Sequence, residues 1–165
     1  MKTLRDQIQG QHIKQVIYSE VNDHQGPLFH QGFDCFDYGI NICMKNDFWW
    51  HIAFKSHEYF ELGEGRFYHN DYLDSGDLIM VDATSRWQSW IPHVVKDLQV
   101  DWTNKELNIP GSCEIQFYGI GPVTLRIGPE LEPDGSLPHP FPHEIGEIYV
   151  FFEQEIVRGL NIWNN

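Results

Sequence analysis

The sequence has few basic residues and no long apolar run. Its 165 residues include 11 lysines and arginines against 24 aspartates and glutamates, a formal net charge of −13. Such a charge repels nucleic acid and anionic lipid, so we expect neither as a partner. The N-terminal stretch lacks the apolar run of a secretory signal, and no segment approaches the ~20 apolar residues of a membrane span. We therefore expect a cytoplasmic protein that does not associate with membranes.

Cysteine is scarce, and the three that occur lack the spacing of a metal or redox motif. Cys35, Cys43 and Cys113 are odd in number and form no CxxC pair. Two of them lie inside apolar, strand-like runs. We predict three reduced, buried thiols rather than a disulfide or a metal site.

Recognisable catalytic motifs are absent. The chain has no G-x-S-x-G, no paired Cys and His signature and no glycine-rich phosphate loop. His51, His57 and His69 can in principle pair with Glu58 or Asp71 as a general base, but no nucleophile accompanies them. We predict a protein that is not an enzyme, with no catalytic residue and no cofactor.

The best metal candidates are His139, His143 and Glu144, which lie in a proline-rich loop. Imidazole and carboxylate groups suit zinc or another divalent ion. Two histidines four residues apart share one ligand face only in a helix, and three prolines within residues 138–142 exclude a helix there. We predict a polyproline-like loop and no bound metal.

The residues that are present suffice for one folded domain. Hydrophobic residues make up 41% of the chain, aromatic residues 15% and charged residues 21%. This composition differs from that of a disordered protein, and a chain of this length buries roughly two-thirds of its unfolded surface. We predict a single domain over residues 1–165.

Alternation of apolar and polar residues predicts a strand-rich chain. We expect strands over residues 13–18, 36–44, 48–54, 98–102, 113–118, 123–127 and 148–152. Short turn sequences join 36–44 to 48–54 and 113–118 to 123–127 as predicted hairpins. The run 148–152 is apolar on both sides, as a central strand would be.

Two short helices complete the predicted fold. Thr3 and Asp6 form a capping-box pattern that begins a helix near residues 3–9, and a second helix is expected near 85–91. The predicted fold class is strand-rich α+β with antiparallel sheets. The order of helix, strand and hairpin recurs in halves of about 1–82 and 83–165, which indicates an internal duplication. The alternative is that this order is a common α+β layout.

The negative charge is concentrated in two segments. Residues 55–82 contain seven acids and two bases, a net of −5, and residues 129–157 contain seven acids and no base, a net of −7. Together they carry −12 of the total −13. If the halves are repeats, the segments would lie at matching sheet edges and form one negative surface. The alternative is a solvated acidic face that serves solubility.

Aromatic residues lie among the acids of the first segment, as in many binding surfaces. The predicted partner-binding residues are Glu58, Tyr59, Glu61, Glu64, Tyr68, Asp71, Tyr72, Asp74 and Asp77. Charges of this sign speed the encounter with a basic protein. We expect the partner to be such a protein.

In size, cytosolic character, acidity and lack of motif, the chain resembles bacterial immunity proteins of the contact-dependent inhibition or polymorphic toxin type. These proteins neutralise toxins delivered by neighbouring cells, and many of the toxins are basic nucleases. The resemblance implies a non-enzymatic toxin inhibitor that occludes the active site of a cognate toxin domain. Its acids would mimic nucleic-acid phosphates, and its aromatic residues would supply the binding hot spots.

Two other hypotheses remain open. One is a small uncharacterised enzyme or metal-binding protein that uses His139, His143 and Glu144 or the His51–His69 region. The other is a housekeeping α+β domain whose charge serves solubility, with homo-oligomers formed through exposed sheet edges.

Overall fold

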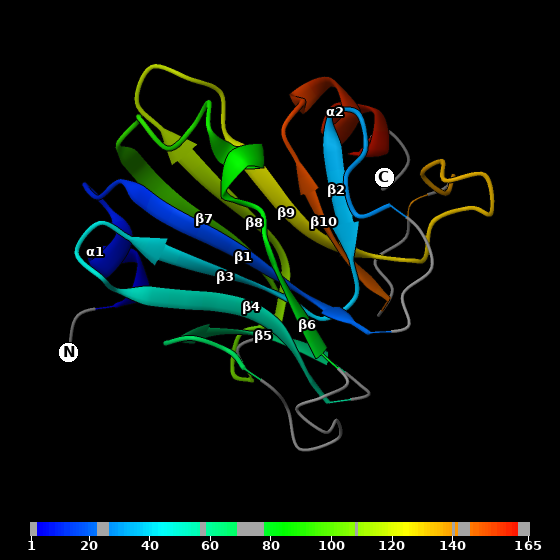
Figure 1. The fold of residues 1–165 in the computed structure, drawn as a ribbon, viewed down its shortest axis with the longest axis horizontal. Helices are drawn as coiled ribbons and strands as arrows, with labels where there is room; N and C mark the ends of the chain where they lie inside the picture. Colours follow the sequence, from blue (N-terminus) through cyan, green and yellow to red (C-terminus); the bar gives the residue numbers. More distant parts are fainter. Residues whose placement is uncertain are drawn as a thin grey trace.

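The fold was obtained as a computed structural model, which describes residues 3–22, 27–56, 59–68, 78–107, 109–139, 141 and 146–161 (Figure 1). The elements in chain order are α1 (Leu4–Ile8), β1 (Ile13–Val21), β2 (Phe33–Phe36), β3 (Gly39–Met44), β4 (Trp49–Ser56), β5 (Tyr59–Glu64), β6 (Leu78–Asp82), the 3-10 helix η1 (Thr84–Trp87), β7 (Val95–Asn104), β8 (Ile109–Phe117), β9 (Val123–Gly128), β10 (Glu147–Phe151) and α2 (Gln154–Asn161). No helix in these ranges is long and apolar enough to cross a membrane.

The strands form two five-stranded antiparallel sheets (Figure 1). Sheet I has the order β5-β4-β3-β1-β6, and sheet II has the order β2-β10-β9-β8-β7. The prediction of a strand-rich, antiparallel fold is therefore confirmed, and the chain is mostly β. The hairpins β3–β4 and β8–β9 form as predicted, and β10 lies between two neighbours.

Each sheet contains a four-stranded meander. In sheet I it runs through β1, β3, β4 and β5, and in sheet II through β7, β8, β9 and β10. The fifth strands differ in this respect. Strand β2 leaves the first part of the chain to pair with β10 in sheet II, whereas β6 pairs with β1 in sheet I. The second sheet thus depends on residues from the first part of the chain.

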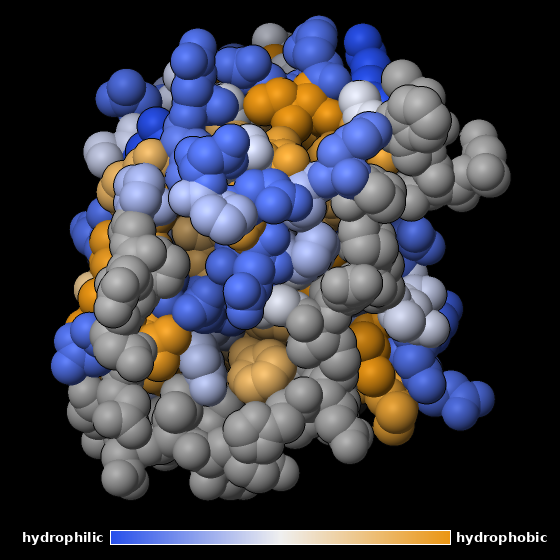
Figure 2. All heavy atoms as spheres, turned by 90° about the vertical axis from the view of Figure 1, so that its right-hand side faces the viewer, coloured by the Kyte–Doolittle hydropathy of each residue, from blue (hydrophilic) through white to orange (hydrophobic). Residues whose placement is uncertain are grey.

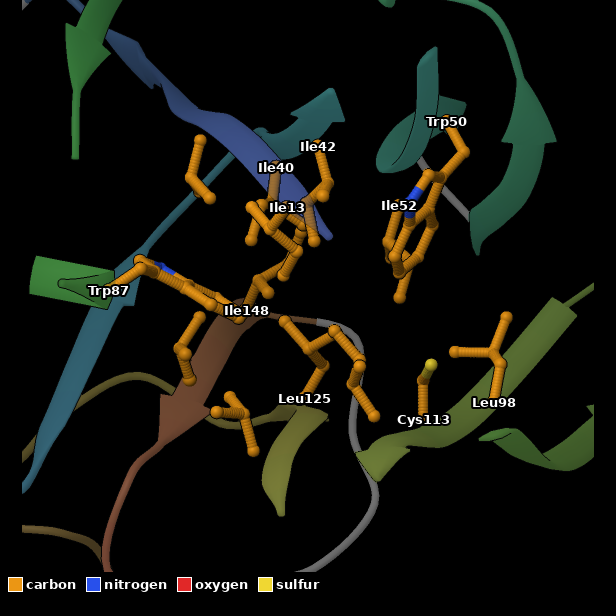
Figure 3. Packing of buried hydrophobic residues seen from close by; sticks show 14 of the residues in the cluster. Ile13, Ile40, Ile42, Trp50, Ile52, Trp87, Leu98, Cys113, Leu125 and Ile148 are labelled. Atoms are coloured by element: carbon orange, nitrogen blue, oxygen red, sulfur yellow. The ribbon is translucent and has the colours of Figure 1, made fainter. Parts of the chain in front are cut away.

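The main hydrophobic core lies between the two sheets. Figure 3 shows Ile40, Ile42 and Trp50 of sheet I pointing towards Leu125 and Ile148 of sheet II. Trp50 is fully buried in this core, as is Trp87 of η1, at 0% exposed. Burial of apolar surface contributes about 25 cal/mol of folding free energy per Å². The layer between the sheets is therefore the main source of stability.

A second, smaller core lies on the outer face of sheet II. The amphipathic helix α2 buries Val157 and Leu160 there against Phe33 and Phe151. The loop after β9 adds Phe141, which is 2% exposed and contacts the Tyr149 ring edge-on at 5.0 Å. Helix α2 and strands β5 and β6 were not among the elements predicted from the sequence.

The prediction of one strand over 36–44 was wrong. Phe36 ends β2 and faces Ile148 in sheet II, whereas Gly39 begins β3 in sheet I. Between them the Tyr38 amide donates to the Ser19 carbonyl, at 3.2 Å, which starts the new pairing. Alternation of side chains cannot reveal such a change, because it is the same in either sheet.

The two predicted helices had different outcomes. Thr3 and Asp6 form the expected capping box, and α1 follows. The expected helix over 85–91 is only the single 3-10 turn of η1, followed by turns up to Pro92. Its N-terminus has no side-chain cap, and the proline prevents continuation. Cys35, Cys43 and Cys113 are free and buried, as predicted.

Candidate functional site

An acidic cavity of about 510 Å³ lies beside the β2 edge of sheet II. Its walls come from the segment before β2, from β2 and β10, and from the loop after β9. The lining residues are Pro27, His30, Cys35, Glu130, Leu131, Glu132, Pro133, Asp134, Gly135 and Glu147. Figure 2 views the side of the molecule on which this loop lies, and hydrophilic residues occupy the middle of that face.

A tight turn holds the acidic loop. The Glu132 amide donates to the Ser136 carbonyl at 3.0 Å, and the Gly135 amide donates back to Glu132 at 2.8 Å. Gly135 has a φ of +80°, a left-handed conformation that glycine adopts without strain. The Ser136 amide donates to Asp134 at 2.9 Å. Hydrogen bonds from the Ser136 hydroxyl and amide lower the pKa of Asp134. The carboxylate therefore stays ionised at the tip of the loop.

Cys35 and Tyr149, a pair across β2 and β10, lie below this loop. The Cys35 thiol donates to Glu147 Oε2, and the Tyr149 hydroxyl donates to the Pro129 carbonyl at 2.5 Å. Burial, followed by the nearby Glu147 charge, raises the pKa of Cys35 far above its usual range. A thiol that stays protonated is a poor nucleophile, so this arrangement does not favour covalent chemistry.

The lining of the cavity is strongly negative. It includes the carboxyl groups of Glu130, Glu132, Asp134 and Glu147, and no lysine or arginine among the residues that the structure describes. The first three are exposed, so a partner can reach them. Clefts lined by charge of one sign concentrate the opposite charge and speed its encounter. The arrangement suits a cationic ligand or a basic protein surface.

The predicted partner-binding residues of the first acidic segment are only partly within the described residues. Glu58, Asp71, Tyr72, Asp74 and Asp77 lie outside them, and Tyr59 is described only in its backbone. The remaining members are described in full, and they do not point in one direction.

Glu61, Glu64 and Tyr68 occupy three different environments. Glu61 faces the outer side of sheet I, 3.8 Å from His51 Nε2. Glu64 lines a groove of about 740 Å³ near α1, together with Leu62 and Trp102. Tyr68 is 59% exposed and stacks on the Arg66 guanidinium, which also contacts Trp49. Alternation along β5 separates the first two acids, because residues 61 and 64 differ in parity.

Glu61 and Glu64 lie apart from the acidic loop of the second segment. Strand β5, which carries Glu61 and Glu64, is the edge of sheet I that contacts β8. The acidic loop lies instead beside β2, at the edge of sheet II farthest from β7. Sequence reasoning noted the charge of residues 129–157 but did not predict the cavity, since His30 and Cys35 carry no motif that would mark them.

The predicted metal candidates are not brought together within the described part of the chain. His139 is exposed, and His143 and Glu144 lie outside the described residues. No group of three or more His, Cys, Asp or Glu residues in the described ranges is arranged to hold a metal ion.

Comparison with known proteins gave no relative. No family model matches the chain, and neither a curated protein nor a solved structure matches it.

Proposed function

We propose that this chain is a non-enzymatic acidic protein that binds a basic protein, specifically an immunity protein that occludes the active site of a basic toxin such as a nuclease. The observation that carries the proposal is the cavity lined by Glu130, Glu132, Asp134 and Glu147. The exposed carboxylates of the loop that lines it complement the cationic cleft of a nucleic-acid enzyme in charge. Binding there would exclude the toxin's substrate.

The state of the candidate nucleophiles agrees with a binding role. Burial raises the pKa of Cys35 and Cys113 well above their usual range, and both thiols are shielded from solvent. A protein that acts by occlusion needs a preformed surface and no reactive group. The loop that carries the acids has its own hydrogen-bonded turn and is anchored by Leu131 and Leu137 in the second core.

We also propose that the fold arose by internal duplication of an α+β unit. Each four-stranded meander follows a short helical turn, α1 before β1 and η1 before β7. The starts of β1 and β7 lie side by side, since His12 and Val94 form a β-bridge. This arrangement supports a pseudo-symmetric origin for the two sheets.

The experiment begins with the gene that lies immediately upstream. A toxin-like C-terminal domain encoded there would be produced alone and with this protein. We expect the domain alone to stop growth and co-expression to restore it, with salt-sensitive binding between the purified proteins. An upstream operon of metabolic enzymes, or binding that is absent, would contradict the proposal.

A matched pair of variants tests the cavity itself. Glu130→Lys with Glu132→Lys reverses two charges at the cavity, and Asp101→Lys with Glu106→Lys reverses two exposed charges elsewhere. We expect the first pair to weaken toxin binding at least ~10-fold, or about 1.4 kcal/mol, and the second pair to change it much less. Equal effects from both pairs would mean that net charge, not the cavity, attracts the partner.

A further inference from the structure

His51 is a buried histidine on the outer face of sheet I. It pairs across the sheet with Asn41 of β3 and Gly63 of β5, and only 8% of its surface is exposed. The ring lies directly over Gly63, where a Cβ atom would come within 2.6 Å of His51 Nε2. Phe67 contacts the ring at 5.9 Å between centroids. The imidazole is therefore held in one orientation by its neighbours.

The hydrogen bond at one ring nitrogen determines the state of the other. His51 Nδ1 lies 3.0 Å from the Gly65 carbonyl, which can only accept, so Nδ1 carries the proton. In the neutral ring Nε2 then presents a lone pair. Nε2 is buried and has no hydrogen-bond partner among the described residues. A buried polar atom without a partner is destabilising, and an electrophilic ligand would relieve that cost.

A second acceptor, the Glu61 carboxylate, lies close to this lone pair. Glu61 Oε1 lies 3.8 Å from His51 Nε2, and the Glu61 side chain is 25% exposed. An imidazole nitrogen and a carboxylate oxygen are ligands that zinc prefers. Zn–N and Zn–O bonds of ~2.0–2.2 Å add up to slightly more than this separation, so one ion can touch both atoms. The Nδ1–H to carbonyl hydrogen bond is also the usual support of a metal-binding histidine.

We propose that His51 Nε2 and Glu61 bind a divalent transition-metal ion such as zinc. Two described residues supply protein ligands, and water or a group from a bound molecule completes the coordination. The site lies on sheet I, apart from the acidic cavity of sheet II. Failure of the metal proposal would therefore leave the proposed toxin binding untouched, and the reverse also holds.

The test uses the untagged full chain, freed of metal with a chelator and then titrated with zinc. Calorimetry measures affinity, and long-range 1H–15N NMR reports the His51 nitrogens. We expect a Nδ1–H tautomer with a bare Nε2 before zinc, and a shift of the Nε2 resonance when zinc is added. His51→Gln and Glu61→Gln should each weaken zinc binding at least ~10-fold, while His139→Gln, at an exposed loop histidine, should change it less than ~2-fold.

Three results would overturn the proposal. One is a proton on Nε2 at neutral pH, which would mean that a His51–Glu61 ion pair already satisfies the nitrogen. A second is equal zinc affinity for His51→Gln and the wild type. A third is loss of affinity only in His139→Gln, which would place the metal in the proline-rich loop. The NMR measurement on the wild type decides the question even if a variant fails to fold.

Discussion

The Tyr18 hydroxyl of sheet I donates to Asp34 Oδ2 of sheet II at 2.8 Å, and both residues are 0% exposed. Trp87 Nε1 donates to the same hydroxyl at 3.0 Å, and the Arg86 guanidinium pairs with Asp34 Oδ1 at 2.6 Å. Burial raises the pKa of Asp34, and the hydrogen bonds from Arg86 and Tyr18 oppose this rise. This network joins the two sheets through polar contacts at the side where β1 approaches β2.

Tyr18→Phe should destabilise the protein by about 1–3 kcal/mol. The change removes one hydroxyl and leaves the buried Trp87 Nε1 and Asp34 Oδ2 each without a partner. Urea unfolding followed by tryptophan fluorescence measures the free energy. Tyr118→Phe is the control, because Tyr118 is 58% exposed and should change the free energy by less than ~0.5 kcal/mol. Similar losses for both variants would show that the network adds nothing.

Glu20 should make the protein less stable as the pH rises. This residue is 1% exposed, and burial, followed by the nearby Asp37 charge, raises its pKa from 4.5 to about 8. Because the folded-state pKa is the higher one, the contribution of Glu20 is complete below about pH 4.5 and is lost as the pH rises through about 8.

The variant Glu20→Gln removes this titration. Unfolding free energies measured in urea between pH 5 and 9 should therefore fall less steeply with pH for Glu20→Gln than for the wild type. Glu106→Gln, at an exposed position, should keep the wild-type slope. An unchanged slope in Glu20→Gln would show that the carboxyl group is already ionised in the folded protein.

Gly128→Ala should weaken the second core. A Cβ atom at this position would lie 2.3 Å from Phe141 Cζ, so the buried ring must move. Overpacking of this kind typically costs about 1–3 kcal/mol. Gly121→Ala is the matched control, because no atom lies within 4 Å of its new Cβ. Thermal unfolding should show a lower Tm for Gly128→Ala alone; equal Tm values would mean that the ring has free space to shift.

Gly159→Ala should instead stabilise the protein. Gly159 is exposed within α2, and nothing lies within 4 Å of an added Cβ. Alanine loses less backbone entropy in a helix, so we expect a gain of about 0.5–1 kcal/mol. Urea unfolding measures it. A loss of stability would indicate that α2 contacts a partner surface or another part of the chain at this position.

Local patterns in the sequence predicted individual elements better than their assembly. The capping box at Thr3 and Asp6 forms because its hydrogen bonds join residues three apart. The hairpins form because a short turn places adjacent alternating runs side by side. The α2 helix was missed although Ile156, Val157 and Leu160 have helical spacing, because the run follows an apolar strand without a strong start signal.

The candidate sites were less accessible to sequence reasoning. Glu61 and Glu64 are close in sequence yet face different surfaces, since β5 alternates its side chains. Cys35 and Glu147 are 112 residues apart and meet only because β2 joins the second sheet. No spacing rule connects such residues, so neither the cavity nor the contact between Cys35 and Glu147 could be predicted.

The sequence by itself determined the strand-rich character, the buried thiols and the two acidic segments, because alternation, composition and charge are properties of neighbouring residues. The tertiary structure alone decided that β2 crosses to sheet II, that the acidic loop covers Cys35, and that the outer face of sheet I buries His51 beside Glu61. These outcomes depend on which strands pair over long distances, and that choice is made by the packing of the whole core.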